Sequence, residues 1–209
     1  MPQVKICGIT NADDALAAVE AGARLLGFNF YPKSPRYVSP TDARRIIEQL
    51  PERIKGVGVF VNEDAEGIAR IAWEAGVTSV QLHGDETREF CDSLRGLSII
   101  KALRVGEDFR VEDAAKFETE AVLLDAYFKD LRGGTGHTFD WSIARRTREV
   151  VRRLILAGGL TPENVAAAVE SVRPYAVDVC SGVETAPGRK SFQLMHRFVE
   201  AVREVEAEN

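Results

Sequence analysis

The sequence predicts an α/β fold in which a sheet of parallel strands is covered by helices. Short, near-continuously apolar runs alternate with amphipathic stretches along all 209 residues, as expected for strands buried on both faces. Eight runs occur with no break in composition, so we expect one domain spanning 1–209. Eight strand–helix units in about 200 residues fit a closed (β/α)8 TIM barrel. An open doubly wound sheet is the alternative, which the absence of G-x-G-x-x-G after the first run disfavours.

The strands are assigned to the apolar runs, which are rich in Val, Ile, Leu and Phe. Glycine-containing pairs follow the last two runs, where a turn is expected. The predicted strands are 4–7, 25–30, 55–61, 78–83, 97–103, 121–125, 154–157 and 176–180.

Helices are predicted between the strands from apolar spacing and capping residues. The stretch 11–21 has apolar residues at i, i+3, i+4 and i+7, and Gly22 ends it. Ser39 opens the second helix, with proline and an acid just after it. Asn62 is expected to cap the third, and Thr161 to open the helix after the seventh strand. The final helix starts near 191 and is expected to bury one stripe: Phe192, Met195, Val199 and Val202.

Composition and charge disfavour several classes of partner. Apolar residues make up 45% and charged residues 28%, as in ordinary globular proteins. The net charge is -5 and arginines are scattered among acids, so no nucleic-acid partner is expected. No run approaches a membrane span, and the first residues lack a signal-peptide core. Cys7, Cys91 and Cys180 are an odd number at wide spacing, which favours a reducing cytoplasm over a disulfide framework.

The stretch 121–141 carries the first candidate for catalysis. Its apolar run ends on Asp125, and a loop with Gly133, Gly134 and Gly136 follows. In a barrel, the loops after the strands build the active site. The strand therefore delivers a carboxylate to the functional edge, although Asp125 can alternatively be a turn cap.

Two glycine-containing pairs follow the seventh and eighth strands, where barrels of this type often hold a phosphate. They are Gly158-Gly159 and Ser181-Gly182. Glycine lets backbone N–H groups come close to an anion. Such pairs are also common in turns, but two of them after these strands favour a phosphorylated small-molecule ligand.

Cys7, Arg36 and His83 are further candidates at the same edge. A cysteine is more often structural, but the place of Cys7 at a strand end favours a reactive thiol. Arg36 lies in the loop after the second strand and can pair with a carboxylate or stay solvated. His83 follows the fourth strand, where Asp125 and Cys7 share the edge. A zinc site of Cys7, His83 and Cys180 is disfavoured because no C-x-x-C or H-x-x-x-H spacing supports it, so no metal is predicted.

The other thiols and imidazoles are assigned no function. Cys91 lies inside a predicted helix and Cys180 inside the eighth strand, so both are expected to pack in the interior. His137 and His196 are expected on the surface. Asn29 and Lys101 also stand at strand exits.

Nine stretches, spread over nearly the whole chain, match the motifs of one known family in that family's order. They are KICGIT (5–10), GFNFYPKSPRYV (27–38), VGVFVN (57–62), VQLHGDE (80–86), LLDA (123–126), GGTGHTFDW (133–141), LAGGLTPENV (156–165), VDVCSGVE (177–184) and PGRKS (187–191). KICGIT and GGTG-x-T-F-D-W are highly specific together. On these motifs the chain resembles phosphoribosylanthranilate isomerase.

The resemblance implies a (β/α)8 barrel and an Amadori rearrangement in tryptophan biosynthesis. The substrate would be N-(5-phosphoribosyl)anthranilate and the product 1-(o-carboxyphenylamino)-1-deoxyribulose 5-phosphate. It implies no cofactor, because the protonated Schiff base is itself the electron sink. Members of the family occur as monomers and homodimers, so either state is expected.

The resemblance also implies residue roles. Cys7 would be the general base, Asp125 the general acid, and Arg36 the ligand of the anthranilate carboxylate. His83 and Asp178 match family motifs and would shape the site. Two departures touch neither acid nor base: Cys180 replaces a more usual serine, and His137 replaces a common lysine or glutamine.

Three alternatives are weighed against this interpretation. A sugar-phosphate isomerase of histidine synthesis would need an aspartate at position 7. Indoleglycerol-phosphate synthase would need a catalytic lysine on an early strand and a longer chain. A non-catalytic metabolite-binding barrel would usually have lost Cys7 or Asp125, and both are present.

Overall fold

The computed structural model describes residues 2–125 and 141–207. Eight of its strands form the barrel: β1 (Gln3–Cys7), β2 (Leu25–Asn29), β3 (Lys55–Phe60), β4 (Ser79–Leu82), β5 (Ser98–Arg104), β6 (Ala121–Asp125), β7 (Leu154–Ala157) and β8 (Ala176–Val179). Each pairs in parallel with the next, and β8 pairs with β1, so the sheet is closed. The predicted (β/α)8 barrel is therefore confirmed, and every strand bound agrees with the prediction to within one residue.

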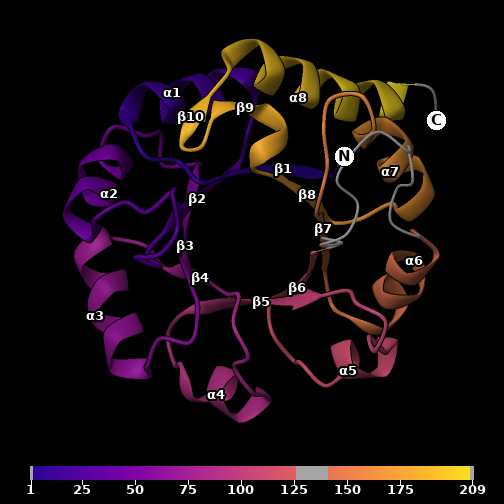
Figure 1. The fold of residues 1–209 in the computed structure, drawn as a ribbon, viewed down its shortest axis with the longest axis horizontal. Coiled ribbons are helices and arrows are strands. Elements are labelled where there is room, and N and C mark those ends of the chain that lie inside the picture. The colour runs from indigo at the N-terminus through magenta and orange to yellow at the C-terminus, as the bar shows by residue number, and fades with distance from the viewer. Residues whose placement is uncertain (1, 126–140, 208–209) are drawn as a thin grey trace.

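The helices form a ring outside the barrel (Figure 1). They are α1 (Ala12–Ala21), α2 (Pro40–Ile47), α3 (Ala65–Ala75), α4 (Arg88–Ser93), α5 (Val111–Ala115), α6 (Trp141–Val150), α7 (Val165–Val172) and α8 (Phe192–Ala207). Across the described residues, no helix is long and apolar enough to cross a membrane.

Local capping explains where the helices begin and end, and it corrects two predictions. Ser39 accepts a hydrogen bond from the Asp42 N–H at the start of α2, as predicted, and Gly22 ends α1 at φ 115°. Asn62 does not cap α3. It adopts a left-handed backbone, and Asp64 is the cap instead. Thr161 also lies short of its helix, because α7 begins only at Val165.

The stripe predicted for the last helix is correct at three of its four positions. Met195, Val199 and Val202 are fully buried, whereas Phe192 is 45% exposed at the first position of α8. Phe192 lies beside His196 on the outside of the helix, with ring centroids 5.9 Å apart. Apolar spacing alone therefore misassigned this first residue of the helix.

The apolar core has two parts. The larger part lies between the barrel and the helices, and the smaller part fills the barrel interior. The buried residues of the interior part are Leu25, Val57, Ile100, Ala102, Ala121, Leu123, Ile155, Ala157 and Ala176. Because side chains alternate along a strand, the residues that follow these on the same face point into the barrel mouth.

A short hairpin after β8 was not predicted. A single 3-10 turn, η1 (Ser181–Val183), leads into β9 (Glu184–Ala186), which pairs antiparallel with β10 (Arg189–Lys190). The hairpin lies beside α1 and α8 (Figure 1). It carries Glu184 and Lys190 to the mouth of the barrel.

Candidate active site

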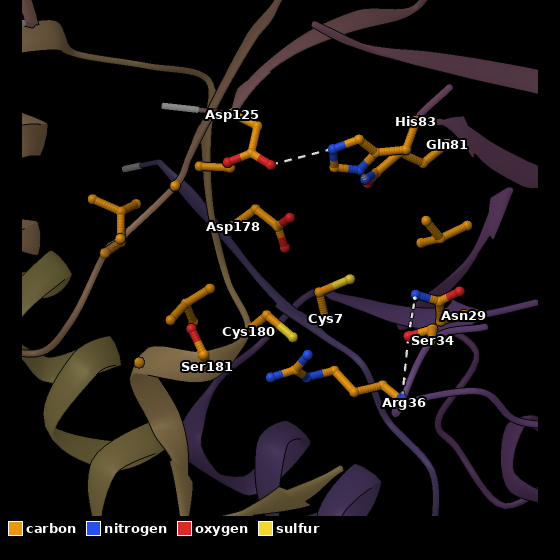
Figure 2. A pocket seen from close by; sticks show the side chains of 17 residues that line it. Cys7, Asn29, Ser34, Arg36, Gln81, His83, Asp125, Asp178, Cys180 and Ser181 are labelled. Atoms are coloured by element: carbon orange, nitrogen blue, oxygen red, sulfur yellow. Dashed lines mark hydrogen bonds and ion pairs between the residues drawn. The ribbon is translucent and has the colours of Figure 1, made fainter. Parts of the chain in front are cut away.

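A cavity of about 280 Å³ lies at the carboxyl ends of the barrel strands. That volume is near the lower end of the range for sites that bind small molecules, about 300–1,000 Å³. All nine of the predicted site residues line it: Cys7, Arg36, His83, Asp125, Gly158, Gly159, Asp178, Ser181 and Gly182. Figure 2 shows Asp125 and His83 on one side of this space, Arg36 on the other, and Cys7 and Asp178 between them.

Asp125 is held at the end of β6 by a chain of two hydrogen bonds from β4. The His83 Nε2 lies 3.2 Å from the Asp125 Oδ2, and the Gln81 Nε2 lies 3.0 Å from the His83 Nδ1. Gln81 donates to Nδ1, so the imidazole proton sits on Nε2 and points at Asp125. The Gln81 Oε1 is buried and has no hydrogen-bond partner among the described residues. The chain fixes the carboxyl group while leaving it a quarter exposed to the cavity.

A buried ion pair lies directly below Cys7. The Lys5 Nζ is 2.9 Å from the Asp178 Oδ1, and Lys5 is fully buried. Burial opposes the charge on Lys5, but the charges of Asp178 and Cys7 outweigh it and raise the pKa of Lys5 above its usual value. Burial also raises the pKa of Asp178 to about 6, against the opposing effect of Lys5. The pair places a permanent cation inside the barrel beneath the thiol.

The surroundings of Cys7 favour its thiolate form. A hydrogen bond from the Cys180 thiol, aided by the charges of Lys5 and Lys190 and opposed by burial, holds the pKa of Cys7 well below the ordinary thiol value. Gly27 stands beside Cys7 in the β1–β2 register, and a Cβ at position 27 would lie 2.6 Å from the Cys7 Sγ. Only glycine at that position leaves room for the thiol where it stands.

Arg36 is clamped by a carboxylate from the hairpin. Its Nε lies 2.9 and 3.1 Å from the two Glu184 oxygens, and its Nη2 lies 2.6 Å from Oε2. The Lys190 Nζ lies 2.8 Å from the Glu184 Oε1. Burial alone would raise the pKa of Glu184, but the hydrogen bonds from Arg36 and Lys190 outweigh it and hold that pKa below its usual range. Arg36 bonds Glu184 through Nε and Nη2, which leaves Nη1 as the part of the guanidinium available to a ligand.

The loops after β7 and β8 form one wall of the cavity. Gly158 and Gly159 have φ of 86° and 66°, left-handed backbone that a side chain would strain. A Cβ at Gly182 would overlap the carbonyl oxygen of Leu160, so the two loops lie in backbone contact. A Cβ at Gly159, in contrast, would meet no atom within 4 Å. This wall combines backbone N–H groups with open space, the arrangement that accepts an anion.

The sequence model of the family described as N-(5'phosphoribosyl)anthranilate (PRA) isomerase matches residues 4–201. The chain belongs to this family. A relative named N-(5'-phosphoribosyl)anthranilate isomerase, from Trichlorobacter lovleyi, is 48% identical over 204 residues, which cover 98% of this chain and 99% of the relative.

Solved structures of the isomerase have the same fold. The phosphoribosyl anthranilate isomerase of Thermotoga maritima is 47% identical, with a TM-score of 0.91 over 98% of this chain and 100% of that one. A second structure is a complex with reduced 1-(o-carboxyphenylamino)-1-deoxyribulose 5-phosphate. It is 45% identical, with a TM-score of 0.88 over 98% and 100% of the two chains. This chain is therefore an isomerase of tryptophan biosynthesis.

Cys180 and Lys101 differ from their predicted places in this isomerase. β8 ends at Val179, so Cys180 follows the strand and lines the cavity, which corrects its assignment as a packing residue. Lys101 lies in the middle of β5 and not at its exit, and it faces away from the cavity, with its Nζ 2.6 Å from the Glu86 carboxylate. Cys91 is buried in α4 and His196 is exposed on α8, as predicted.

Part of the sequence prediction concerns the glycine-rich loop and His137, which lie outside the described residues. Within the described residues, no group of three or more His, Cys, Asp or Glu side chains is arranged to hold a metal ion.

Sequence reasoning missed four contributors to the site. Gln81 lies on β4 and precedes His83, which directly follows that strand, by two positions, so strand alternation would have indicated that both face the cavity. Ser34 accepts from the Asn29 amide at 3.1 Å and from the Arg36 N–H at 3.1 Å, and so fixes the β2 loop. Glu184 and Lys190 gave no local signal, because their partners are distant in sequence.

Proposed function

We propose that this isomerase rearranges N-(5'-phosphoribosyl)anthranilate with Cys7 as general base and Asp125 as general acid. The observation that carries the proposal is that a thiol favoured as its thiolate and a carboxyl group share one cavity with an arginine and an anion-accepting wall. This reaction requires a base, an acid and a binding group for each end of an elongated anionic substrate.

The acid acts first. Asp125 carries a proton when the substrate binds and transfers it to the oxygen of the furanose ring, so that the ring opens to a protonated Schiff base. The Nε2–H of His83 then donates to the carboxylate that remains. The exposed fraction of Asp125 faces the cavity, so its oxygen can reach the substrate.

The base completes the rearrangement. The Cys7 thiolate removes the proton from C2 of the ribose, and the electrons move into the iminium group. The resulting enolamine becomes the ketone by tautomerisation. Lys5 below and Lys190 beside the pair of thiols supply the positive charge that favours the thiolate.

The two ends of the substrate bind to different groups of the cavity. Arg36 takes the anthranilate carboxylate, held in place by Glu184. The backbone of Gly158, Gly159 and Gly182, together with Ser181, takes the phosphate. Asp178 keeps Lys5 charged and in place.

Turnover of freshly prepared phosphoribosylanthranilate, followed as loss of anthranilate-type fluorescence with a chelator present, tests the proposal. Native protein should act fast, while Cys7→Ser and Asp125→Asn should lose about 100-fold or more with unchanged folding. Near-native rates in either variant would overturn that residue's role. Tight binding of a phosphate-bearing product analogue without turnover would instead indicate a binding barrel.

The proposal also covers domain organisation, location in the cell and oligomeric state. The chain forms a single domain over 1–209 and works in the cytoplasm. It is a monomer or a homodimer: one Thermotoga maritima structure is described as monomers generated from a dimeric isomerase, at 45% identity. Light scattering of the native protein distinguishes the two states.

A further inference from the structure

Cys7 ends β1, and Cys180 directly follows the end of the neighbouring strand β8. The register of β1 and β8 pairs Lys5 with Asp178 and Ile6 with Val179, so the next positions are 7 and 180. Neighbouring strands lie about 4.8 Å apart, and the Cα atoms of a disulfide are usually about 4.4–6.8 Å apart. The backbone thus places the two cysteines at a separation that a disulfide can span.

Both thiols also face the same space. Lys5 and Asp178 point into the barrel, since their side chains bond at 2.9 Å. Cys7 comes two residues after Lys5, and Cys180 two residues after Asp178, so both point the same way as that pair. Both also line the cavity. Each thiol also shifts the pKa of the other, Cys7 downward and Cys180 upward. In Figure 2 they occupy the region between Asp178 and Arg36.

We propose that Cys7 and Cys180 are an oxidant-modification site, in which hydrogen peroxide converts the two thiols into a reversible disulfide. The cavity that admits the substrate also admits a molecule as small as peroxide. A serine at position 180 could not form this bond.

The chemistry balances in two steps. The Cys7 thiolate attacks one peroxide oxygen, the O–O bond breaks, and the products are a sulfenic acid and hydroxide. The Cys180 sulfur then attacks the Cys7 sulfur, the S–O bond breaks, and the leaving hydroxide takes the Cys180 proton to form water. The two sulfurs are oxidised by two electrons in total, and peroxide is reduced to one hydroxide, which takes a proton from the solvent, and one water.

The surroundings suit each cysteine to its step. Cys7 is the more nucleophilic of the pair, because its lowered pKa favours the thiolate form. The Lys190 Nζ lies 3.8 Å from the Cys180 Sγ, where its charge assists loss of the Cys180 proton during the second step. Cys91, buried in α4 outside the cavity, has its pKa raised to about 11 by burial and is no competitor.

The disulfide would occupy the sulfur that the proposed function uses as its base, and turnover would stop until a dithiol reductant restores it. Only this loss of turnover rests on the proposed function. Formation of the disulfide does not rest on the proposed function, because mass spectrometry detects the linked peptide whether or not Cys7 is the base.

Native protein is treated with a small excess of hydrogen peroxide at neutral pH, quenched with catalase, and divided. One part is digested without reduction for mass spectrometry of a peptide that links positions 7 and 180. The other part is assayed before and after dithiothreitol. The linked peptide should form, turnover should fall about 100-fold, and dithiothreitol should restore most of it.

Two variants serve as controls, each compared with its own untreated activity. Cys180→Ser has no second thiol, so peroxide should carry Cys7 on to sulfinic acid, and dithiothreitol should restore little. Cys91→Ser should behave like native protein. Sulfinic acid on Cys7 of the native protein without the linked peptide would overturn the proposal, as would full recovery in Cys180→Ser. A linked peptide with turnover intact would uphold the disulfide and overturn Cys7 as the base.

Discussion

Replacing Glu184 with glutamine tests how this isomerase holds Arg36. The carboxylate is nearly buried, with 4% of its side chain exposed, and it bonds Arg36 through both Nε and Nη2. The substitution keeps the shape but removes the charge from this fork and from the Lys190 contact at 2.8 Å. Arg36 is then free to leave the position at which its Nη1 meets a ligand.

The expected magnitudes follow from these contacts. Breaking a buried ion pair from one side costs about 3 kcal/mol of folding free energy. A hydrogen bond from a guanidinium to a ligand carboxylate contributes up to about 3 kcal/mol. Losing about half of that contribution raises KM about tenfold, since about 1.4 kcal/mol is a factor of ten. The chemical step uses other residues, so kcat should change little.

Glu86→Gln is the matched control. Glu86 pairs with Lys101 at 2.6 Å, and their side chains are only 3% and 2% exposed. It also accepts loop N–H groups, as Glu184 does. Both variants should lose similar stability in urea denaturation, but only Glu184→Gln should show the rise in KM. An unchanged or lower KM in Glu184→Gln would refute the clamp, because it would mean that Glu184 competes with the substrate for Arg36.

Three more predictions follow from the same region. Gly27→Ala should lower kcat at least about tenfold by displacing the Cys7 thiol, while Gly106→Ala, where a Cβ meets nothing within 4 Å, should not. Asp178→Asn should remove part of the pH dependence of the folding free energy. The pKa of Asp178 is raised from 3.8 to about 6 in the folded state, so folded protein binds an extra proton between these pH values, and the contribution of Asp178 to stability falls as pH rises. Urea midpoints of the variant and the native protein at pH 4 and 7 measure the difference. Lys5→Met should raise the pKa of Cys7 and so shift the acidic limb of the plot of kcat/KM against pH to higher pH.

Much of the fold was predictable because its signals are local. A strand buried on both faces must be apolar along its whole length, so eight runs located eight strands. The site then followed from topology, since parallel strands bring their carboxyl ends to one edge. Cys7, Asp125 and the two glycine pairs all stand at that edge, and all line the cavity.

The missed features depend on contacts that no local pattern records. Arg36 and Glu184 are 148 positions apart, and their pairing needs the β9–β10 hairpin. Cys180 was assigned to the core because its strand ends one residue earlier than predicted. Asn62 has a typical capping residue type, but its φ of 52° turns the chain away from the helix.

Alkylation of Cys7 by iodoacetamide, followed by peptide mass spectrometry across about pH 6 to 9, tests the central claim most directly. A thiolate base in the substrate cavity predicts a rate that is already at its plateau by neutral pH, loss of turnover in proportion to Cys7 modified, and protection by reduced 1-(o-carboxyphenylamino)-1-deoxyribulose 5-phosphate. A rate that climbs through the ordinary thiol pKa, or full modification with turnover intact, would contradict it.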